Sequence, residues 1–372
     1  MRTLSRKAAA WACGATIAAT GAGVGVYFAV ANGQTPAAAE HLAVVHPPPP
    51  PPLRLVSISP ANGTQGFDGS DEITVTFNQP LPAADPLPQV SPAITGTWQR
   101  EGDAAVFTPQ TGIPADTTET VMVSEGVGGV RSGKSSFTTA GYSTLRLQEL
   151  LAQLGYLPLT WTPDLGAAIP NDSPAAQLAA IYEPPPGTFQ WEQGYPASLQ
   201  GFWQQGSANT LDKGAITAFE ADHGLPLDGV AGTKVWADLL SAAESGTGNP
   251  HGYSYAIASQ SEPESLTIWH DGREVMSTPA NTGISVAPTP VGTFPVYEKL
   301  PYQVMQGTNP DGSSYADPVQ WVSYFSGGSA VHYIARGAYG YPQSLGCVEL
   351  PYNAAEQAYP YLTYGTLVTV TP

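Results

Sequence analysis

Hydrophobic and polar residues alternate in one part of the chain, which indicates β-strands. Residues 72–77 and 119–123 follow a period of two, with apolar side chains at every second position. Further short strand candidates, separated by Gly- and Pro-containing turns, are found at residues 53–58, 96–99, 104–107 and 135–138. Residues 53–140 are therefore predicted to form a small β-sandwich of immunoglobulin-like type.

The spacing of apolar residues changes to a helical period over residues 141–245. Leu147, Leu150, Leu151 and Leu154 fall on one helical face, and Gly155 follows as a candidate C-terminal cap. Two more helices are predicted, one around Ala215, Ile216 and Phe219 and one around Trp236, Leu239 and Leu240. A segment rich in Trp, Pro and Gly, residues 157–210, separates the first helix from the other two.

Residues 252–372 return to β character. Strands are predicted at 255–258 and 265–269, with His270, Asp271 and Gly272 as the hairpin turn at their tip. Further strands are expected at 331–333 and 367–370, and Asn353 with Glu356 has the spacing of a helical capping box. The fold class is therefore multi-domain and mainly β, with a helical part in the middle.

The N-terminus has the pattern of an export signal. Residues 1–7 are basic, and residues 8–31 are uncharged and end in the small-x-small sequence Ala29-Val30-Ala31. Residues 1–31 are predicted to be a cleaved signal peptide or an uncleaved membrane anchor, with Cys13 as an apolar residue within it. The Ala/Pro-rich residues 32–52 end in six consecutive prolines and are predicted to be a stiff linker. The rest of the chain is then expected in the cell envelope or outside the cell.

Composition excludes several classes of function. The net charge is −17 with only 13 Lys and Arg residues, three of them in the first seven positions, so no basic surface remains for nucleic acid. A hydrophobic content of 42% excludes disorder throughout the chain. No His, Cys or Asp pattern has the spacing of metal ligands, so neither a metal nor another cofactor is expected.

Cys347 is the only cysteine in the predicted exported part, and it is the strongest candidate for chemistry. His332 precedes it in a predicted strand and is a candidate base, and Gly346 directly before the cysteine permits close approach of backbone N–H groups to an oxyanion. The helix predicted after the cysteine is expected to lower the pKa of its thiol. A buried cysteine with an unrelated histidine is the alternative interpretation of the same residues.

The middle part of the chain resembles the bacterial peptidoglycan-binding three-helix domain. The similarity lies in residues 145–156 and in a later run, Gly214–Phe219, His223-Gly224-Leu225, Asp228–Gly232 and Val235-Trp236. The family implies a helical wall-binding domain over 141–245, interrupted here by the insertion 157–210.

Residues 252–372 resemble the L,D-transpeptidases, the cysteine enzymes that cross-link bacterial cell walls. The similarity lies in the segments Ser265–Trp269, Asp271-Gly272, Asn281-Thr282-Gly283, Thr289–Phe294, His332 and Ser344–Val348. This resemblance implies that Cys347 attacks the carbonyl between diaminopimelate and D-alanine in a peptidoglycan stem peptide, with His332 as the base. It also implies that the carbonyl of Tyr333 orients the imidazole, that the N–H groups of Gly346 and Cys347 form the oxyanion hole, and that carbapenems inhibit the enzyme. A second stem would resolve the thioester into a 3→3 cross-link.

The same resemblance suggests substrate contacts and two departures from the family pattern. Ser344 is expected to contact substrate, and a cleft under a lid loop at 300–320 is expected to be lined by Tyr302, Met305, Trp321, Tyr324 and Phe325. Leu345 stands where the family commonly has His, and Glu349 where it has Arg or Asn. A carboxylate at Glu349 is expected to raise the thiol pKa and change substrate recognition. The alternatives are therefore an L,D-carboxypeptidase and a wall-binding scaffold with an impaired catalytic domain.

Overall fold

The computed structural model describes residues 51–110, 112–124, 132–167 and 173–372. The predicted signal peptide or anchor, Cys13 and nearly all of the proline-rich linker lie outside these residues. Within the described ranges, no helix has both the length and the apolar character needed to cross a membrane.

The first described part, up to residue 139, is built from two antiparallel sheets. One sheet has the order β1-β2-β5-β4, with β1 (Leu55–Ser59), β2 (Ile73–Phe77), β5 (Ala104–Pro109) and β4 (Gly96–Glu101). The other has the order β3-β6-β7, with β3 (Gln89–Ser91), β6 (Thr118–Val123) and β7 (Gly133–Thr138). The alternation in β2 buries Ile73, Val75 and Phe77 and leaves the residues between them partly exposed, as the sequence pattern predicts.

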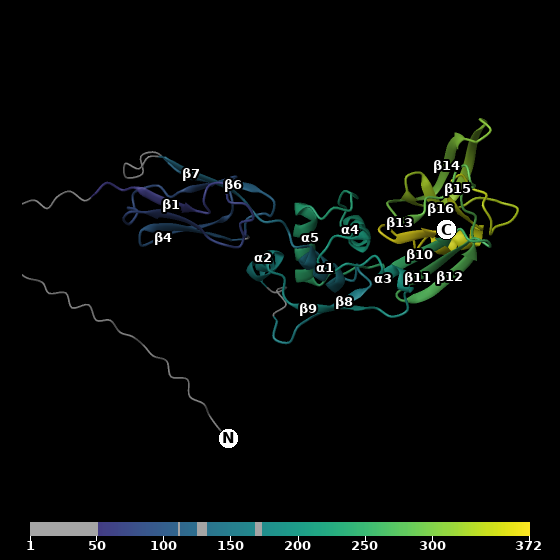
Figure 1. The fold of residues 1–372 in the computed structure, drawn as a ribbon, viewed down its shortest axis with the longest axis horizontal. Helices are drawn as coiled ribbons and strands as arrows, with labels where there is room; N and C mark the ends of the chain where they lie inside the picture. Colours follow the sequence, from purple (N-terminus) through teal and green to yellow (C-terminus); the bar gives the residue numbers. More distant parts are fainter. Residues whose placement is uncertain (1–50, 111, 125–131, 168–172) are drawn as a thin grey trace, which may run out of the picture. The chain divides into compact units, whose positions relative to one another are not determined.

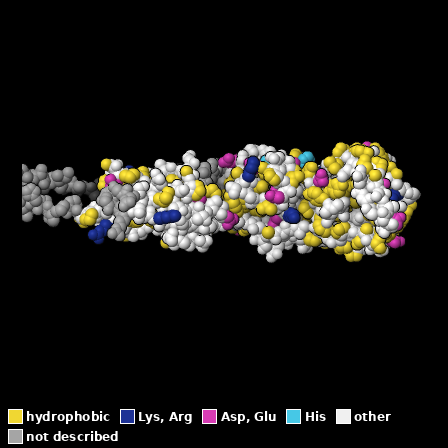
Figure 2. Space-filling view, turned by 90° about the horizontal axis from the view of Figure 1, so that it is seen from above, with side chains coloured by type: hydrophobic (Ala, Val, Ile, Leu, Met, Phe, Trp, Pro, Cys, Tyr) yellow, Lys and Arg dark blue, Asp and Glu magenta, His cyan; other side chains and the backbone are white. Residues whose placement is uncertain are grey.

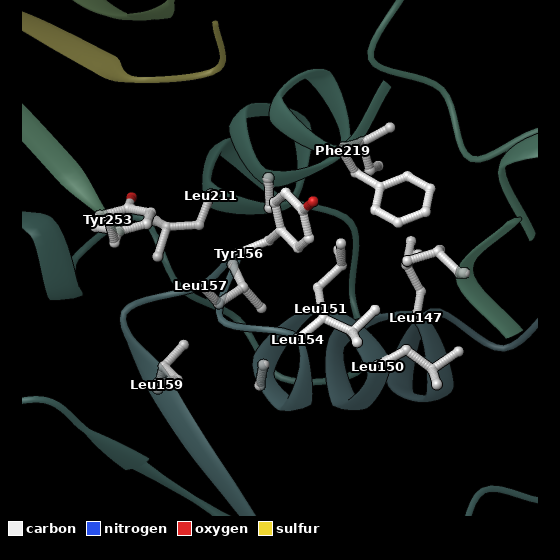
Figure 3. Packing of buried hydrophobic residues seen from close by; sticks show 14 of the residues in the cluster. Leu147, Leu150, Leu151, Leu154, Tyr156, Leu157, Leu159, Leu211, Phe219 and Tyr253 are labelled. Carbon is white, nitrogen blue, oxygen red and sulfur yellow. The ribbon is translucent and has the colours of Figure 1, made fainter. Parts of the chain in front are cut away.

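The three helices predicted from apolar spacing are present as α1 (Thr144–Gln153), α4 (Thr210–Asp222) and α5 (Thr233–Ser245). Gly155 follows α1 with φ +74°, a left-handed conformation that favours glycine after a helix. Figure 3 shows the leucines of α1 pointing toward Phe219 of α4, and Leu150, Leu151 and Phe219 are fully buried. Between α1 and α4, leaving residues 168–172 aside, the structure has β8 (Leu159–Pro163), α2 (Pro174–Tyr182), β9 (Gly187–Trp191) and α3 (Ala197–Gln200).

The apolar core of this helical region continues into the C-terminal β part. Tyr253, Tyr255 and Leu367 belong to the same buried cluster as Leu211 and Phe219. Tyr253 lies beside Leu211 in Figure 3, and the hydroxyl of Tyr195 donates to the Tyr253 carbonyl at 2.8 Å. The immunoglobulin-like part has a buried cluster of its own.

The C-terminal part contains two sheets (Figure 1). The first has the order β12-β11-β10-β18-β13, with β12 (Arg273–Pro279), β11 (Ser265–His270), β10 (Ser254–Ser259), β18 (Leu367–Thr371) and β13 (Gly292–Pro295). The second has the order β14-β15-β16-β17, with β14 (Glu298–Thr308), β15 (Ser314–Ser326), β16 (Ser329–Tyr333) and β17 (Val348–Leu350). Helix α6 (Tyr352–Ala358) packs against β16.

Three local predictions for this part are wrong. The turn at Asp271 and Gly272 joins β11 to β12, not the two strands predicted from the sequence. The expected lid loop at 300–320 is most of the long hairpin β14–β15, which extends from the sheet in Figure 1. Helix α6 begins after Pro351 without a side-chain cap, so Asn353 and Glu356 form no capping box. Because Pro351 takes the N-cap position, Asn353 lies inside the first turn, where it has no capping role.

Charged side chains are sparse on the described surface. Figure 2 shows scattered Lys, Arg, Asp and Glu side chains among mostly uncharged atoms, in agreement with a charged content of 12%.

Candidate active site

A pair of parallel strands brings His332 and Cys347 to one place. In β16 and β17, Val331 pairs with Val348 and His332 pairs with Glu349. Cys347 directly precedes β17 and therefore lies beside the middle of β16. The register thus brings a thiol and an imidazole to the same part of the strand pair, two residues apart in register, although the chain between them forms a long loop.

Both side chains line a single cavity of about 490 Å³. The hairpin β14–β15 supplies one wall and the loop before Cys347 supplies another. The lining includes the candidates Met305, Tyr324, Leu345 and Glu349 and, in addition, Gln303, Asp317, Gly328, Arg336 and Gln343. Its size and its mixture of apolar and charged groups suit a small peptide segment.

His332 is 2% exposed and has a defined tautomer. Its Nδ1 lies 3.1 Å from the carbonyl oxygen of Tyr333, which only accepts, so Nδ1 carries the proton. Burial lowers the pKa of His332, while the Tyr333 carbonyl and Glu349 oppose that shift. The imidazole is therefore neutral at neutral pH, with its Nε2 lone pair available as a base.

The thiol of Cys347 is protonated in this environment. Burial raises its pKa to about 11, and the charge of Glu349 acts in the same direction. Its Sγ donates to the carbonyl of Gly328 at 3.8 Å. The expected lowering of the thiol pKa is thus wrong, because α6 is short, begins only at Tyr352 and does not offset desolvation.

The loop before Cys347 is held by two hydroxyl groups. Ser344 donates to the carbonyl of Cys347 at 2.6 Å and accepts the N–H of Gly346 at 3.1 Å. Thr289 donates to the same carbonyl at 3.2 Å. Gly346 has φ +112°, a conformation that requires glycine. Ser344, which is 1% exposed, thus stabilises this loop. The N–H of Gly346 is hydrogen-bonded to Ser344 and is not free to bind an oxyanion. The N–H of Cys347 remains the candidate oxyanion donor.

The segment Asn281-Thr282-Gly283 supports this loop from the other side. Asn281 and Glu349 exchange two backbone hydrogen bonds at 2.9 and 2.8 Å. Gly283 donates to the hydroxyl of Thr289 at 2.8 Å, and Ile284 donates to the carbonyl of Ser344 at 2.9 Å. Two of the motifs on which the family resemblance rests, Asn281-Thr282-Gly283 and Thr289–Phe294, therefore contribute hydrogen bonds that hold the cysteine loop.

Glu349 is buried, and its charge is paired. Arg336 donates from Nε and Nη2 to the two carboxylate oxygens at 2.8 and 2.6 Å. The side chain of Arg336 is 27% exposed and that of Glu349 is 3% exposed. Sequence reasoning missed Arg336, although a carboxylate in a strand as apolar as Val348–Leu350 signals a nearby cation.

The structure does not bring all of the predicted cleft residues to the cavity. Tyr302 lies on β14 with 55% of its surface exposed and does not line the cavity. Trp321 packs on Tyr359 and against the core of the domain, and Phe325 is buried in that core. Tyr333 contributes its carbonyl, while its ring packs edge-on against Tyr352.

No group of three or more His, Cys, Asp or Glu side chains with metal-binding geometry occurs among the described residues. The site itself combines a half-buried thiol, a neutral histidine base and a backbone oxyanion donor, which are the groups that acyl-transfer chemistry uses.

Comparison with known families identifies the parts of the chain. Residues 253–370 match the YkuD family of L,D-transpeptidase catalytic domains, and residues 50–139 match a bacterial Ig-like domain. The protein is thus a multi-domain, mainly β protein that carries an L,D-transpeptidase catalytic domain and an Ig-like domain, with a helical region between them. Neither match covers the helical region. A search of curated proteins found no match.

Several solved structures are similar to the chain. An L,D-transpeptidase from Mycobacterium smegmatis is 18% identical and covers 87% of this chain and 100% of its own, with a TM-score of 0.30. L,D-transpeptidase 3 from Mycobacterium tuberculosis, solved with a faropenem-derived adduct, is 17% identical over 86% and 98%, with a TM-score of 0.30. The catalytic domain of the E. faecium enzyme, acylated by ertapenem, is 26% identical over 32% and 96%, with a TM-score of 0.29.

Proposed function

We propose that the protein is an L,D-transpeptidase that forms 3→3 cross-links in peptidoglycan through a thioester on Cys347. The observation that carries the proposal is the placement of Cys347 and His332 in one cavity by the β16–β17 register, inside a domain of the matching family. A neutral imidazole with Nδ1 bound to a carbonyl is oriented to accept a proton at Nε2.

The reaction proceeds in two acyl-transfer steps. Cys347 attacks the carbonyl between diaminopimelate and D-alanine while its proton passes to His332. The protonated imidazole then gives this proton to the leaving amine, and D-alanine departs as the thioester forms. The amine of a second stem attacks the thioester, its proton returns through His332 to the sulfur, and the cross-link is released.

The charge states of the resting site favour proton transfer during the attack over a preformed ion pair. The pKa of the thiol is raised to about 11 and that of His332 is lowered, so both groups are neutral before substrate binds. The N–H of Cys347 is the donor we assign to the oxyanion.

The proposal extends to the other parts of the chain. We propose that the protein is exported to the cell envelope by residues 1–31, and that the helical region 141–245 acts as a wall-binding module. The order of linker, Ig-like domain, helical region and catalytic domain supports this arrangement, since it spaces the catalytic domain from an N-terminal attachment.

Intact-mass analysis after incubation with a carbapenem tests the nucleophile. One adduct on the folded protein is expected, and the variant Cys347→Ala should show none. Incubation with a disaccharide-tetrapeptide should release D-alanine and yield dimers. Tripeptide without dimers would assign the carboxypeptidase reaction instead. A folded protein with a titratable Cys347 but neither adduct nor product would contradict catalysis and favour a scaffold role.

A further inference from the structure

The active-site cavity contains two charged groups that the proposed acyl-transfer steps do not use. Arg336 and Asp317 both line it together with Cys347 and His332. Arg336 directs Nε and Nη2 to Glu349, which leaves its Nη1 without a hydrogen bond to any described residue. A guanidinium presents five N–H donors in a planar fork, so donors remain for a second carboxylate.

Asp317 lacks a side-chain partner among the described residues. It lies on β15, is half-buried, and forms neither a hydrogen bond nor an ion pair with any described residue. It lines the same cavity as Arg336 and His332, and its charge raises the pKa of both groups. An ionised carboxylate in a cavity of this kind is stabilised by a bound cation.

The charges in the cavity favour one kind of ligand. Glu349 and Arg336 form a pair of zero net charge, His332 is neutral, and Asp317 adds a negative charge. A ligand with only a carboxylate is repelled by the like charge of Asp317. A ligand with only an ammonium group is repelled by the like charge of Arg336. A ligand that carries both on neighbouring atoms satisfies both side chains.

We propose that this part of the cavity binds a zwitterionic α-amino acid group, with the carboxylate on Arg336 and the ammonium group on Asp317. The inference rests on the proposed function, under which the acyl donor is a stem peptide. The far end of diaminopimelate in that donor carries such a group. Asp317 and Arg336 are then the residues that select the third residue of the donor stem, and Glu349 positions Arg336.

Four tetrapeptides that differ only in their third residue test this assignment. The residues are diaminopimelate, diaminopimelate with the far carboxyl group amidated, lysine, and 2-aminopimelate, which has the far carboxylate but no ammonium group. Acyl-enzyme formation and D-alanine release are measured for each. The unaltered protein should react with the diaminopimelate peptide about tenfold or more faster than with the other three, because an unpaired charge in the site is costly.

Two variants test which side chain binds the ammonium group of the ligand and which binds its carboxylate. Asp317→Asn should remove most of the advantage over the 2-aminopimelate peptide, which lacks the ammonium group. The double variant Arg336→Gln/Glu349→Gln, which keeps a neutral hydrogen-bonding pair, should remove most of the advantage over the lysine and amidated peptides. Glu274→Gln, an exposed change on β12 outside the cavity, is the control for a changed net charge.

The outcomes separate this inference from the proposed function. Equal rates with all four peptides, or unchanged preferences in both variants, overturn the zwitterion site and leave the transpeptidase proposal standing. Failure of every peptide and of a carbapenem to acylate Cys347 in the folded protein overturns the proposed function and this inference with it. Arg336→Lys retains the charge and should keep part of the preference for the diaminopimelate peptide. It provides a second test if the double variant fails to fold.

Discussion

Arg336 binds both carboxylate oxygens of Glu349, at 2.8 and 2.6 Å, from a position thirteen residues earlier in the chain. The carboxylate that stands where the family commonly has Arg or Asn is therefore not an unpaired charge near Cys347. Arg336 supplies a cation from another segment, so the physical argument for an impaired catalytic domain loses most of its force.

Breaking this pair on one side should destabilise the catalytic domain. Arg336→Gln leaves a buried carboxylate without its cation and is expected to lower the free energy of unfolding by about 2 kcal/mol or more. Adding Glu349→Gln should recover most of this loss, because the remaining pair is neutral. Urea unfolding followed by tryptophan fluorescence measures both. An Arg336→Gln protein as stable as the original would show that the pair is not a buried one in solution.

The reactivity of Cys347 should show a raised thiol pKa. Alkylation by iodoacetamide is expected to be slow at pH 7 and to rise steeply only toward pH 11, since the thiol titrates at about 11. Carbapenem acylation should instead be flat through neutral pH and fall on acidification, as His332 takes up a proton below its lowered pKa. If both reactions followed one titration near pH 7, the neutral thiol and imidazole pair would be the wrong resting state.

Removing the hydroxyl of Ser344 should loosen the cysteine loop. Ser344→Ala deletes the bonds to the Cys347 carbonyl and the Gly346 N–H and should cost about 1 kcal/mol of stability. Because the nucleophile is then less well positioned, acylation is expected to slow by about tenfold. Ser277→Ala removes an exposed hydroxyl bonded to Thr267 and serves as the control. Equal acylation rates in the two variants would assign Ser344 no positioning role.

The backbone of Gly346 should tolerate no side chain. Alanine at φ +112° is strained by about 1–3 kcal/mol, although an added Cβ would meet its nearest atom, the hydroxyl of Ser329, only at 3.5 Å. Gly346→Ala is therefore expected to lower both stability and the acylation rate. Gly337→Ala is the matched control, because its backbone is not left-handed and no atom lies within 4 Å of the added Cβ. Thermal unfolding and intact-mass kinetics compare the two.

Local periodicity predicts most of the regular elements. The strands around Ile73–Phe77 and the helix around Leu147–Leu151 follow directly from the spacing of their apolar residues. The sequence does not predict helix α2 or the antiparallel strand pair β8 and β9, because these elements are short and lie in a segment whose Pro and Gly residues obscure any periodicity.

Several side-chain positions in and around the candidate site could not be predicted from the sequence. The sequence analysis predicts that Tyr302 and Met305 line one cleft, although their odd spacing puts them on opposite faces of a strand. Trp321 departs from the alternation of β15 because it has φ +59° within the irregular register between Gln320 and Ser323, which turns it toward the core. The ion pair of Arg336 depends on the packing of a loop on β17, and no local pattern records it.

The shared apolar cluster that joins Tyr255 and Leu367 to the helices affects how the molecule unfolds. The helical region and the catalytic sheet should unfold together in one calorimetric transition. The Ig-like domain has a separate cluster and should unfold in a transition of its own. A shortened chain that starts at residue 252 would then expose Tyr255 and Leu367 to water and aggregate. For this protein, the smallest soluble enzyme would begin near residue 141.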